Sequence, residues 1–325
     1  MDIVKKVSKT IIFHKMIGSK DKIGVAVSGG ADSIAMLVCL NELKDIWNSS
    51  LFVLHLNHQI RGREADEDGD FVSKVASILN IPFICERYDV KTFAKEEHLN
   101  LEAAARIVRY RFFEEVKKKN NLNKIALGHT KNDQIENFLM RVLRGSSLKG
   151  LTSILPVRDF YIRPLIYISR DEILNFLKQR NIAYREDKTN YDLHFLRNRI
   201  RHVLVPELRK YNKNLVDTVS RMCLCLQTDE NLLEKLTKET FQEVCFFKDG
   251  KWFIKRDDLI KESESLQMRV ISEAVKRLMQ SDYSLSFENI MRIHELLHEK
   301  KTVHLRKILR AYVKGEFLVV EKSED

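Results

Sequence analysis

The chain has 325 residues, a length that suits about two domains. Hydrophobic residues make up 44% of it, enough for a packed core, and charged residues make up 31%, too many for a membrane protein. No apolar run approaches the roughly 18 residues that a membrane-spanning helix needs. The opening stretch, M-D-I-V-K-K-V-S-K-T, lacks the apolar segment of an export signal. We therefore expect a cytoplasmic protein.

The charge balance and the cysteines indicate which partners and which bound groups to expect. Lysine and arginine outnumber aspartate and glutamate by 56 to 46, a net charge of +10 that favours a polyanionic partner such as nucleic acid. The odd number of cysteines and the lack of a C-x-x-C pair argue against a disulfide framework and against a zinc or iron–sulfur site. We expect reduced thiols at Cys39, Cys85, Cys223, Cys225 and Cys245.

Strand and helix patterns alternate along the first half of the chain. Short apolar runs predict buried strands at 23–27, 51–56, 82–88 and 124–128. Amphipathic stretches predict helices near 32–44, 65–79, 101–119 and 133–144. This alternation predicts an α/β fold with a doubly wound parallel sheet, whose ligands bind at the carboxyl ends of the strands.

The second half of the chain is mainly helical. Ser169 and Glu172 form a capping-box pattern that predicts the start of a helix. The stretch from 214 to 240 predicts a long helix with one buried stripe, formed by Val216, Val219, Met222, Leu226 and Leu233. Short strands, K-W-F-I-K and F-L-V-V-E, and amphipathic helices follow it. We expect an N-terminal domain at 1–206, a helical connector at 207–240 and a small α+β C-terminal domain at 241–325.

The turn after the first strand, S-G-G-A-D-S, predicts a phosphate site. Adjacent glycines allow close approach of the backbone to a ligand, and the N-terminus of the next helix attracts anions. A Walker A loop would need a lysine after the glycines, and a Rossmann turn would need a third glycine. A glycine-rich turn without a ligand is the structural alternative. The string favours a pyrophosphatase-type loop, which holds the β- and γ-phosphates of ATP so that the α-phosphorus reacts and AMP is formed.

Six consecutive residues form this expected nucleotide site. They are Ser28, Gly29, Gly30, Ala31, Asp32 and Ser33. Backbone N–H groups and the two hydroxyls would donate to phosphate, while Asp32 would orient Mg²⁺ or the reacting group. We therefore expect an adenylating enzyme with ATP and Mg²⁺ as cofactors.

Polar residues follow two other strands at the same edge of the expected sheet. The loop H-L-N-H-Q-I-R-G at 55–62 either faces the phosphate turn or is simply solvated. In the 133–144 helix, Asp133 and Glu136 share one face, and we expect the opposite side to be core. That core side comprises Ile135, Phe138, Leu139, Val142 and Leu143. The two carboxylates either compensate the helix dipole or bind Mg²⁺ or a cationic substrate.

Two further stretches carry arginines at helical spacing. Glu102, Arg106 and Arg109 fall on one stripe of the 101–119 helix. Arg197 and Arg201 are four residues apart, opposed by an apolar side of Leu196, Ile200 and Val203. Guanidinium pairs of this kind suit bidentate recognition of phosphate, and a solvated basic face is the alternative.

The string H-E-L-L-H at 294–298 matches the zinc-protease pattern, with His294 and His298 as ligands and Glu295 as base. Its surroundings are small, charged and without other signs of a peptidase. An amphipathic helix accounts for the same residues without metal, and we expect its packed side to be Ile290, Ile293, Leu296 and Leu297.

Taken together, six stretches in order across about 23–206 resemble the tRNA(Ile)-lysidine synthetase family of the PP-loop, or N-type ATP pyrophosphatase, superfamily. They are V-S-G-G-A-D-S, H-L-N-H-Q-I-R-G, L-E-A-A-A-R-I-V-R-Y, G-H-T-K-N-D-Q-I-E, R-V-L-R-G-S-S-L-K-G-L and L-R-N-R-I-R. The C-terminal third is a weaker match. Thr130 and Asn132 stand where many members have His and Asp, and Lys188-Thr189 replaces a common Pro-Ser.

The resemblance implies an AMP-forming ligase that joins carbon to nitrogen. ATP adenylates the C2 oxygen of the wobble cytidine in a tRNA(Ile) with a CAU anticodon. The ε-amine of free L-lysine then attacks C2, AMP leaves, and the lysidine that results reads AUA instead of AUG. Expected partners are this tRNA and L-lysine, with a homodimer as one candidate assembly and no membrane. The C-terminal domain is expected to hold tRNA.

The resemblance also implies roles for individual residues. The catalytic set is Asp32, Asp133, Glu136, Arg109 and Arg201. His55, Asn57 and Arg197 join the six loop residues in nucleotide binding, and Asp32 is the metal ligand. We expect Asp32→Ala and Glu136→Ala to remove activity with little change in thermal stability, because both are taken as exposed polar positions.

Two alternatives stay open at this point. A tRNA thiolation enzyme of the same superfamily also adenylates a base carbonyl, and many such enzymes use paired cysteines. A nucleotide-gated RNA-binding protein would show no turnover at all.

Overall fold

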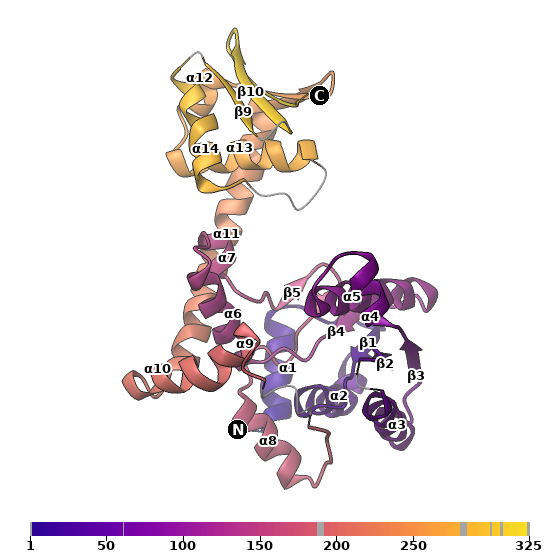
Figure 1. The fold of residues 1–325 in the computed structure, drawn as a ribbon. Helices are drawn as coiled ribbons and strands as arrows, with labels where there is room; N and C mark the ends of the chain where they lie inside the picture. The colour runs from indigo at the N-terminus through magenta and orange to yellow at the C-terminus, as the bar shows by residue number, and fades with distance from the viewer. Residues whose placement is uncertain are drawn as a thin grey trace. The chain divides into compact units, whose positions relative to one another are not determined.

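The computed structural model describes residues 2–60, 62–186, 192–279, 285–299, 301–305 and 308–323 (Figure 1). The chain divides into two compact units, Met1–Gln227 and Thr228–Asp325. This division falls inside one continuous helix, α11 (Leu215–Val244). The predicted scheme, with a separate connector at 207–240 and a tRNA-binding part at 241–325, stays a prediction.

The first unit is built on a six-stranded sheet in the order β3-β2-β1-β4-β6-β5. Its strands are β1 (Lys22–Ala26), β2 (Ser50–Asn57), β3 (Phe83–Arg87), β4 (Lys124–Ala126), β5 (Val157–Arg158) and β6 (Tyr161–Ile162). The first five strands in this order form four parallel pairs, and β5 at the edge pairs antiparallel with β6. The predicted parallel α/β sheet is confirmed. Its strand order reverses between β1 and β4, and ligands bind at such a switch point.

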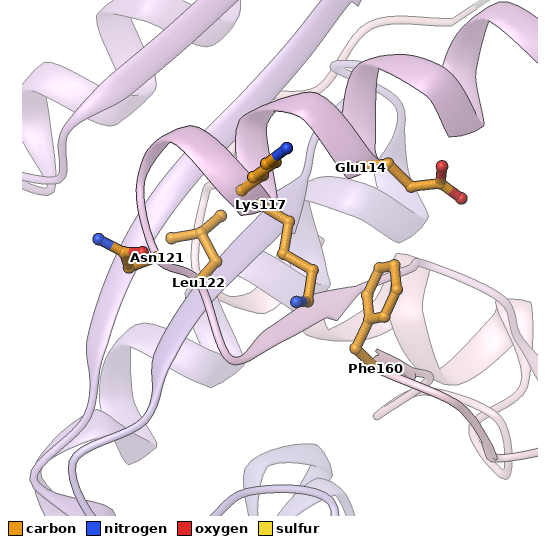
Figure 2. A pocket seen from close by; sticks show the side chains of 6 residues that line it. Glu114, Lys117, Asn121, Leu122 and Phe160 are labelled. Atoms are coloured by element: carbon orange, nitrogen blue, oxygen red, sulfur yellow. The ribbon is translucent and has the colours of Figure 1, made fainter.

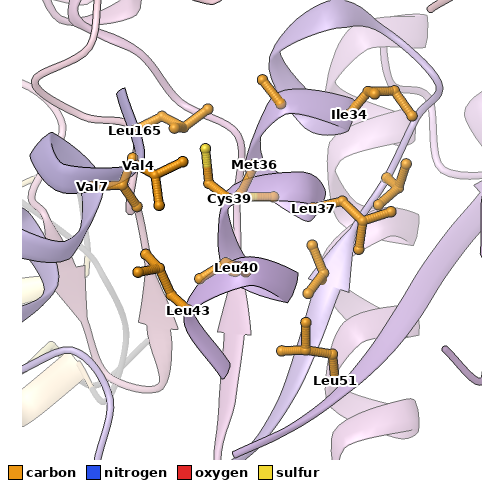
Figure 3. Packing of buried hydrophobic residues seen from close by; sticks show 14 of the residues in the cluster. Val4, Val7, Ile34, Met36, Leu37, Cys39, Leu40, Leu43, Leu51 and Leu165 are labelled. Carbon is orange, nitrogen blue, oxygen red and sulfur yellow. The ribbon is translucent and has the colours of Figure 1, made fainter. Parts of the chain in front are cut away.

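The helices of the first unit pack partly on this sheet and partly with α11. They are α1 (Ile3–Phe13), α2 (Ala31–Leu43), η1 (Lys44–Trp47), α3 (Arg63–Ile78), α4 (Val90–Glu96), α5 (Leu101–Lys119), α6 (Lys131–Leu143), α7 (Leu148–Leu151), α8 (Arg170–Gln179), α9 (Leu196–Arg199), η3 (Ile200–Leu204) and α10 (Val205–Tyr211). One core cluster joins α1, α2, α3 and α8 to the sheet, with Val7, Leu37 and Leu165 among its buried members (Figure 3). A second joins α5 to β2 and β4. The capping box predicted from Ser169 and Glu172 is present at the start of α8.

Helical periodicity wrongly assigned four residues to buried apolar faces. Val142 and Leu143 of α6 are 50% and 62% exposed, and Met222 of α11 is 38% exposed. Val203, expected on an apolar side, is also exposed. A helix has room for one packed face, and here Ile135 packs with Ile200, Val216, Val219 and Cys223. That packing turns Met222 outward and buries the carboxylates of α6 instead of the residues at its far end.

The second unit holds a five-stranded antiparallel sheet in the order β7-β8-β11-β10-β9. Its strands are β7 (Cys245–Lys248), β8 (Lys251–Lys255), β9 (Thr302–Leu305), β10 (Leu309–Lys314) and β11 (Phe317–Lys322). Its helices after α11 are α12 (Arg256–Leu259), α13 (Glu264–Met279), α14 (Phe287–His294) and η4 (Glu295–Leu297). They share one core with the sheet, as an α+β domain requires.

A surface hollow of about 570 Å³ lies away from the expected site (Figure 2). Leu122 and Phe160, which line it, precede β4 and β6, so it opens at the amino ends of the parallel strands. The Nζ atom of Lys117 sits 4.7 Å from the centre of the Phe160 ring. Among the described residues, no helix is long and apolar enough to cross a membrane.

Candidate active site

The turn between β1 and α2 is held in shape by its own two serines. The Ser33 hydroxyl donates to the Gly30 carbonyl at 2.9 Å and accepts from the Ser28 amide at 3.2 Å. The Ser28 hydroxyl in turn accepts from the Gly30 amide at 3.4 Å. Gly30 is the N-cap of α2 and has no side chain to cap it, so the first N–H groups of the helix stay available to an anion.

Gly29 has a φ of +92°, which L side chains rarely adopt. A Cβ atom there would meet Phe71 at 3.5 Å and Val72 at 3.6 Å, which are ordinary contacts, so the backbone angle is what requires glycine. The Gly29 carbonyl accepts from the Arg185 amide at 2.9 Å. The loop is therefore fixed from outside as well as from within.

Asp32 lies in the first turn of α2 with its two oxygens in different surroundings. Oδ2 accepts from Arg170, the first residue of α8, at 2.8 Å. Oδ1 is buried and has no hydrogen-bond partner among the described residues. Burial raises the pKa of Asp32 to about 6, and the charge of Arg170 opposes that rise. One carboxylate oxygen is thus available to a ligand from outside the chain.

The two carboxylates of α6 are paired with Arg197 and Arg201. Glu136 is 2% exposed and accepts from Arg201 at 2.6 and 2.9 Å and from Arg197 at 2.8 Å. Arg197 also pairs with Asp133. The sequence left two alternatives for Arg197 and Arg201, phosphate binding or a solvated basic face, and this arrangement confirms neither. It shows a buried ion network, and the sequence-based view of Glu136 as an exposed position is wrong.

Asp133 also caps the N-terminus of α6. Its Oδ2 accepts from the Thr130 amide at 2.7 Å and from the Thr130 hydroxyl at 2.9 Å, which completes a capping box. Burial raises the pKa of Asp133, but the charge of Arg197 and the hydrogen bond from the Thr130 amide outweigh burial and lower it overall. Asp133 is therefore ionised and has both oxygens engaged.

The structure adds two residues to the site that periodicity did not indicate. His129 precedes α6, and its Nδ1 accepts from Nε of Arg163 at 3.2 Å. Loss of hydration lowers the pKa of His129 to about 4, so the ring is neutral and carries its proton on Nε2. Arg163 is 5% exposed and also donates to the Leu155 carbonyl at 2.7 Å. Charge interactions connect His129 with Arg109 and with the α6 network.

The remaining predicted arginine, Arg109, is exposed on α5, as are Glu102 and Arg106. Surrounding protein atoms nevertheless lower its pKa, and its charge interacts with that of Arg197. Arg106 lies over the Tyr110 ring, with 5.0 Å from the guanidinium carbon to the ring centre. The three residues are all exposed on α5, and the charges of both Glu102 and Arg109 interact with that of Arg197.

His55 and Asn57 lie buried at the end of β2. Nδ1 of His55 donates to the Val27 carbonyl at 2.8 Å, while its buried Nε2 has no partner among the described residues. Burial lowers the pKa of His55, which keeps the ring neutral. Asn57 donates to Asp66 at 2.9 Å and accepts from the Gln59 amide at 2.9 Å. Their nucleotide-binding roles stay predictions, and Arg61 and Lys188-Thr189 lie outside the described residues.

The H-E-L-L-H segment packs as an amphipathic helix. Ile293, Leu296 and Leu297 are buried, Ile290 is half-buried, and Nε2 of His294 donates to the Gln267 side chain at 2.7 Å. Across the part of the chain that the structure describes, no three His, Cys, Asp or Glu side chains form a group that could hold a metal ion.

Comparison with known proteins agrees with this geometry. A family model described as a PP-loop domain matches residues 3–208. The tRNA(Ile)-lysidine synthase of Clostridioides difficile (strain 630) is 35% identical over 328 residues, which cover 99% of this chain and 71% of that protein. The synthase of Clostridium acetobutylicum is 38% identical over 314 residues, which cover 95% of this chain and 68% of that protein.

A solved structure shares the fold. The U34-tRNA thiolase from Methanococcus maripaludis, solved with its 4Fe–4S cluster, superimposes with a TM-score of 0.59 at 23% identity. The alignment covers 69% of this chain and 77% of the thiolase. At that identity the likeness concerns the fold alone. From the PP-loop match and the identity to curated relatives over nearly its whole length, the chain belongs to the tRNA(Ile)-lysidine synthase family.

Proposed function

We propose that this chain uses ATP to ligate free L-lysine to C2 of the wobble cytidine in tRNA(Ile) with a CAU anticodon. AMP and pyrophosphate leave, and the lysidine that forms changes the codon read from AUG to AUA. Beyond family membership, the composition of the site carries the proposal. The loop from Ser28 to Ser33 has no lysine for γ-phosphoryl transfer, and a network of carboxylates and arginines adjoins it through Asp32.

ATP would lie with its phosphates on the Ser28–Ser33 loop and on the N-terminus of α2. The preformed hydrogen bonds of Ser28 and Ser33, and the positive φ of Gly29, fit that use. Mg²⁺ binds proteins through one or two carboxylates together with phosphate oxygens. The free Oδ1 of Asp32 fits such a ligand, and the ion would neutralise charge on the departing pyrophosphate.

The nucleophile is an amine, so bound lysine must lose a proton before it attacks. We assign its ammonium group to the carboxylates of Asp133 and Glu136, which now pair with Arg197 and Arg201. For this binding the arginines must exchange partners, and the phosphate of the adenylated base is the anion that suits them. Arg109, with the neutral His129 beside it, would stabilise the same phosphate.

The C-terminal part, 241–325, is proposed to hold the tRNA while the reacting base is splayed into the first unit. A ring atom is reached only after unstacking, which is easier in an anticodon loop than in a duplex. The net charge of +10 suits binding through phosphates. A cytoplasmic location fits this substrate, and the homodimer remains an expectation.

The cysteines weigh against the thiolation alternative. Burial raises the pKa of Cys39 and of Cys245 to about 12 and that of Cys223 to about 11, so these thiols are poorly reactive. All five cysteines are free in the structure, and Cys85 and Cys225 are exposed on separate elements, β3 and α11.

The decisive experiment compares two tRNA transcripts that differ only in carrying C or U at the wobble position. Labelled lysine should enter the C transcript alone. Equal incorporation into both would contradict the proposed substrate, and labelled sulfur in place of lysine would establish the thiolation alternative. Activity with no nucleotide consumed would contradict adenylation.

A further inference from the structure

The sheet of the second unit packs one face against helices, and its opposite face carries aromatic and cationic side chains. Ile254, Leu318 and Ala311 belong to the core that the sheet shares with α13 and α14. Side chains alternate along a strand, so the residues between them point the other way. We call that opposite side the outer face.

The strand register arranges the outer face in rows. The middle row runs from Phe246 through Phe253, Val319 and Tyr312 to Thr302. One flanking row holds Lys248, Lys251, Glu321, Arg310 and His304. The other holds Lys255, Phe317 and Lys314. Aromatic side chains thus lie between two rows that are rich in cations.

Three phenylalanines form a single cluster on this face. Phe246 and Phe253 stack with ring centres 5.1 Å apart and an interplanar angle of 5°. Phe317 meets both edge-on, at 5.4 and 5.9 Å. Phe246 is 39% exposed although a ring of its size gains much from burial. Val319, the cross-strand neighbour of Phe253, is fully buried, while Phe246 presents aromatic surface to solvent.

The charges on the outer face have one dominant sign. Lys248, Lys255, Lys314 and Arg310 are exposed. The acidic residue of these rows, Glu321, is 8% exposed and is paired with Lys251 at 2.5 Å and with Arg310 at 3.6 Å. A ligand approaching this face therefore meets positive charge around aromatic rings.

We propose that the outer face binds unpaired nucleotides of the tRNA, with a base stacked on the Phe246 ring and phosphates held by the flanking lysines. The inference rests on the proposed function, since it concerns how that substrate is held. Aromatic side chains on a sheet stack readily on unpaired bases, whereas a duplex hides its base faces. An apolar protein partner would have to desolvate four exposed cations, which favours RNA over protein as the occupant.

The test uses the full chain and single substitutions at Phe246. Phe246→Leu keeps apolar bulk without a π face, and Phe246→Tyr restores the ring. Phe247→Leu is the matched control, because Phe247 is 55% exposed on the same strand but points to the other side, toward Trp252. Binding is measured with a single-stranded hexanucleotide containing 2-aminopurine, with the same sequence as a duplex, and with the unmodified tRNA.

Wild type and Phe246→Tyr should quench the 2-aminopurine of the single strand, and neither should quench it in the duplex. Phe246→Leu should bind the single strand and the tRNA about tenfold more weakly, with Phe247→Leu unchanged. At saturating tRNA, Phe246→Leu should keep the wild-type rate of lysine incorporation, so that KM rises without a fall in kcat. Melting curves of all variants check that the unit stays folded.

Equal binding by Phe246→Leu and wild type, or equal quenching in the single strand and the duplex, would overturn this inference. So would a dimer in solution that Phe246→Leu dissociates, because the face would then be a protein interface. Failure of wild type to incorporate lysine refutes the proposed function alone, since quenching of the hexanucleotide is measured without lysine or ATP.

Discussion

Replacing Glu136 with alanine should destabilise the first unit as well as inactivate it. The substitution removes three charge-assisted hydrogen bonds, from Arg201 at 2.6 and 2.9 Å and from Arg197 at 2.8 Å. Breaking a fully buried ion pair costs about 3–5 kcal/mol, because the remaining charge stays desolvated. The Arg197 and Arg201 side chains are 38% and 29% exposed, so water recovers part of that cost. We expect a loss of about 2–3 kcal/mol.

A loss of this size should lower the melting midpoint of the first unit by roughly 4–12 °C in scanning calorimetry. Glu136→Gln, which keeps the volume and one acceptor oxygen, should lose less. Glu115→Ala removes an exposed glutamate from α5 and serves as the control, with an expected change within about 0.5 kcal/mol. If Glu136→Ala and Glu115→Ala have the same melting midpoint, the ion network does not stabilise the first unit as its geometry indicates.

Three further predictions concern the nucleotide loop. Because burial raises the pKa of Asp32 to about 6, the stability that its protonated form contributes is complete below about pH 4 and is lost as the pH rises through 6. The melting midpoint of Asp32→Asn should therefore lie above that of wild type at pH 8 and should equal it near pH 4. A rise in the midpoint that does not depend on pH would show that burial of the charged carboxylate is not the cause. Turnover with α-labelled ATP should yield AMP on thin-layer plates, and stoichiometric ADP would exclude the mechanism. Gly29→Ala should raise the KM for ATP at least severalfold, since its φ of +92° costs alanine about 1–2 kcal/mol; an unchanged KM would show that the loop tolerates another geometry.

The fold and the nucleotide loop were predictable because their signals are local. A buried strand, two glycines and the start of a helix follow one another in consecutive residues, and the capping box at Ser169 is a four-residue pattern. The β5–β6 pair was not predicted, since two-residue strands leave no periodic signal. The parallel sheet itself follows from the alternation of strand and helix patterns.

The partners within the site were not predictable from local patterns. Arg170 is 138 residues from Asp32, and Arg163 is 34 residues from His129, so only the fold brings them together. The burial of Glu136 was missed for a related reason. Helical periodicity gives the face of a carboxylate, but whether that face meets solvent or an arginine pair depends on a segment 61 residues away.

The neutral state of His129 has a consequence for the order in which substrates bind. With that ring uncharged, the site holds the guanidinium groups of Arg109, Arg163, Arg170, Arg197 and Arg201 against the carboxylates of Asp32, Asp133 and Glu136. The cations are in excess, so before nucleotide binds this set of charges repels a lysine ammonium and attracts a polyanion. In the proposed mechanism, the nucleotide draws some arginines to its phosphates, and the carboxylates they leave become partners for the amine. An ordered kinetic scheme follows, in which the nucleotide binds before the amino acid.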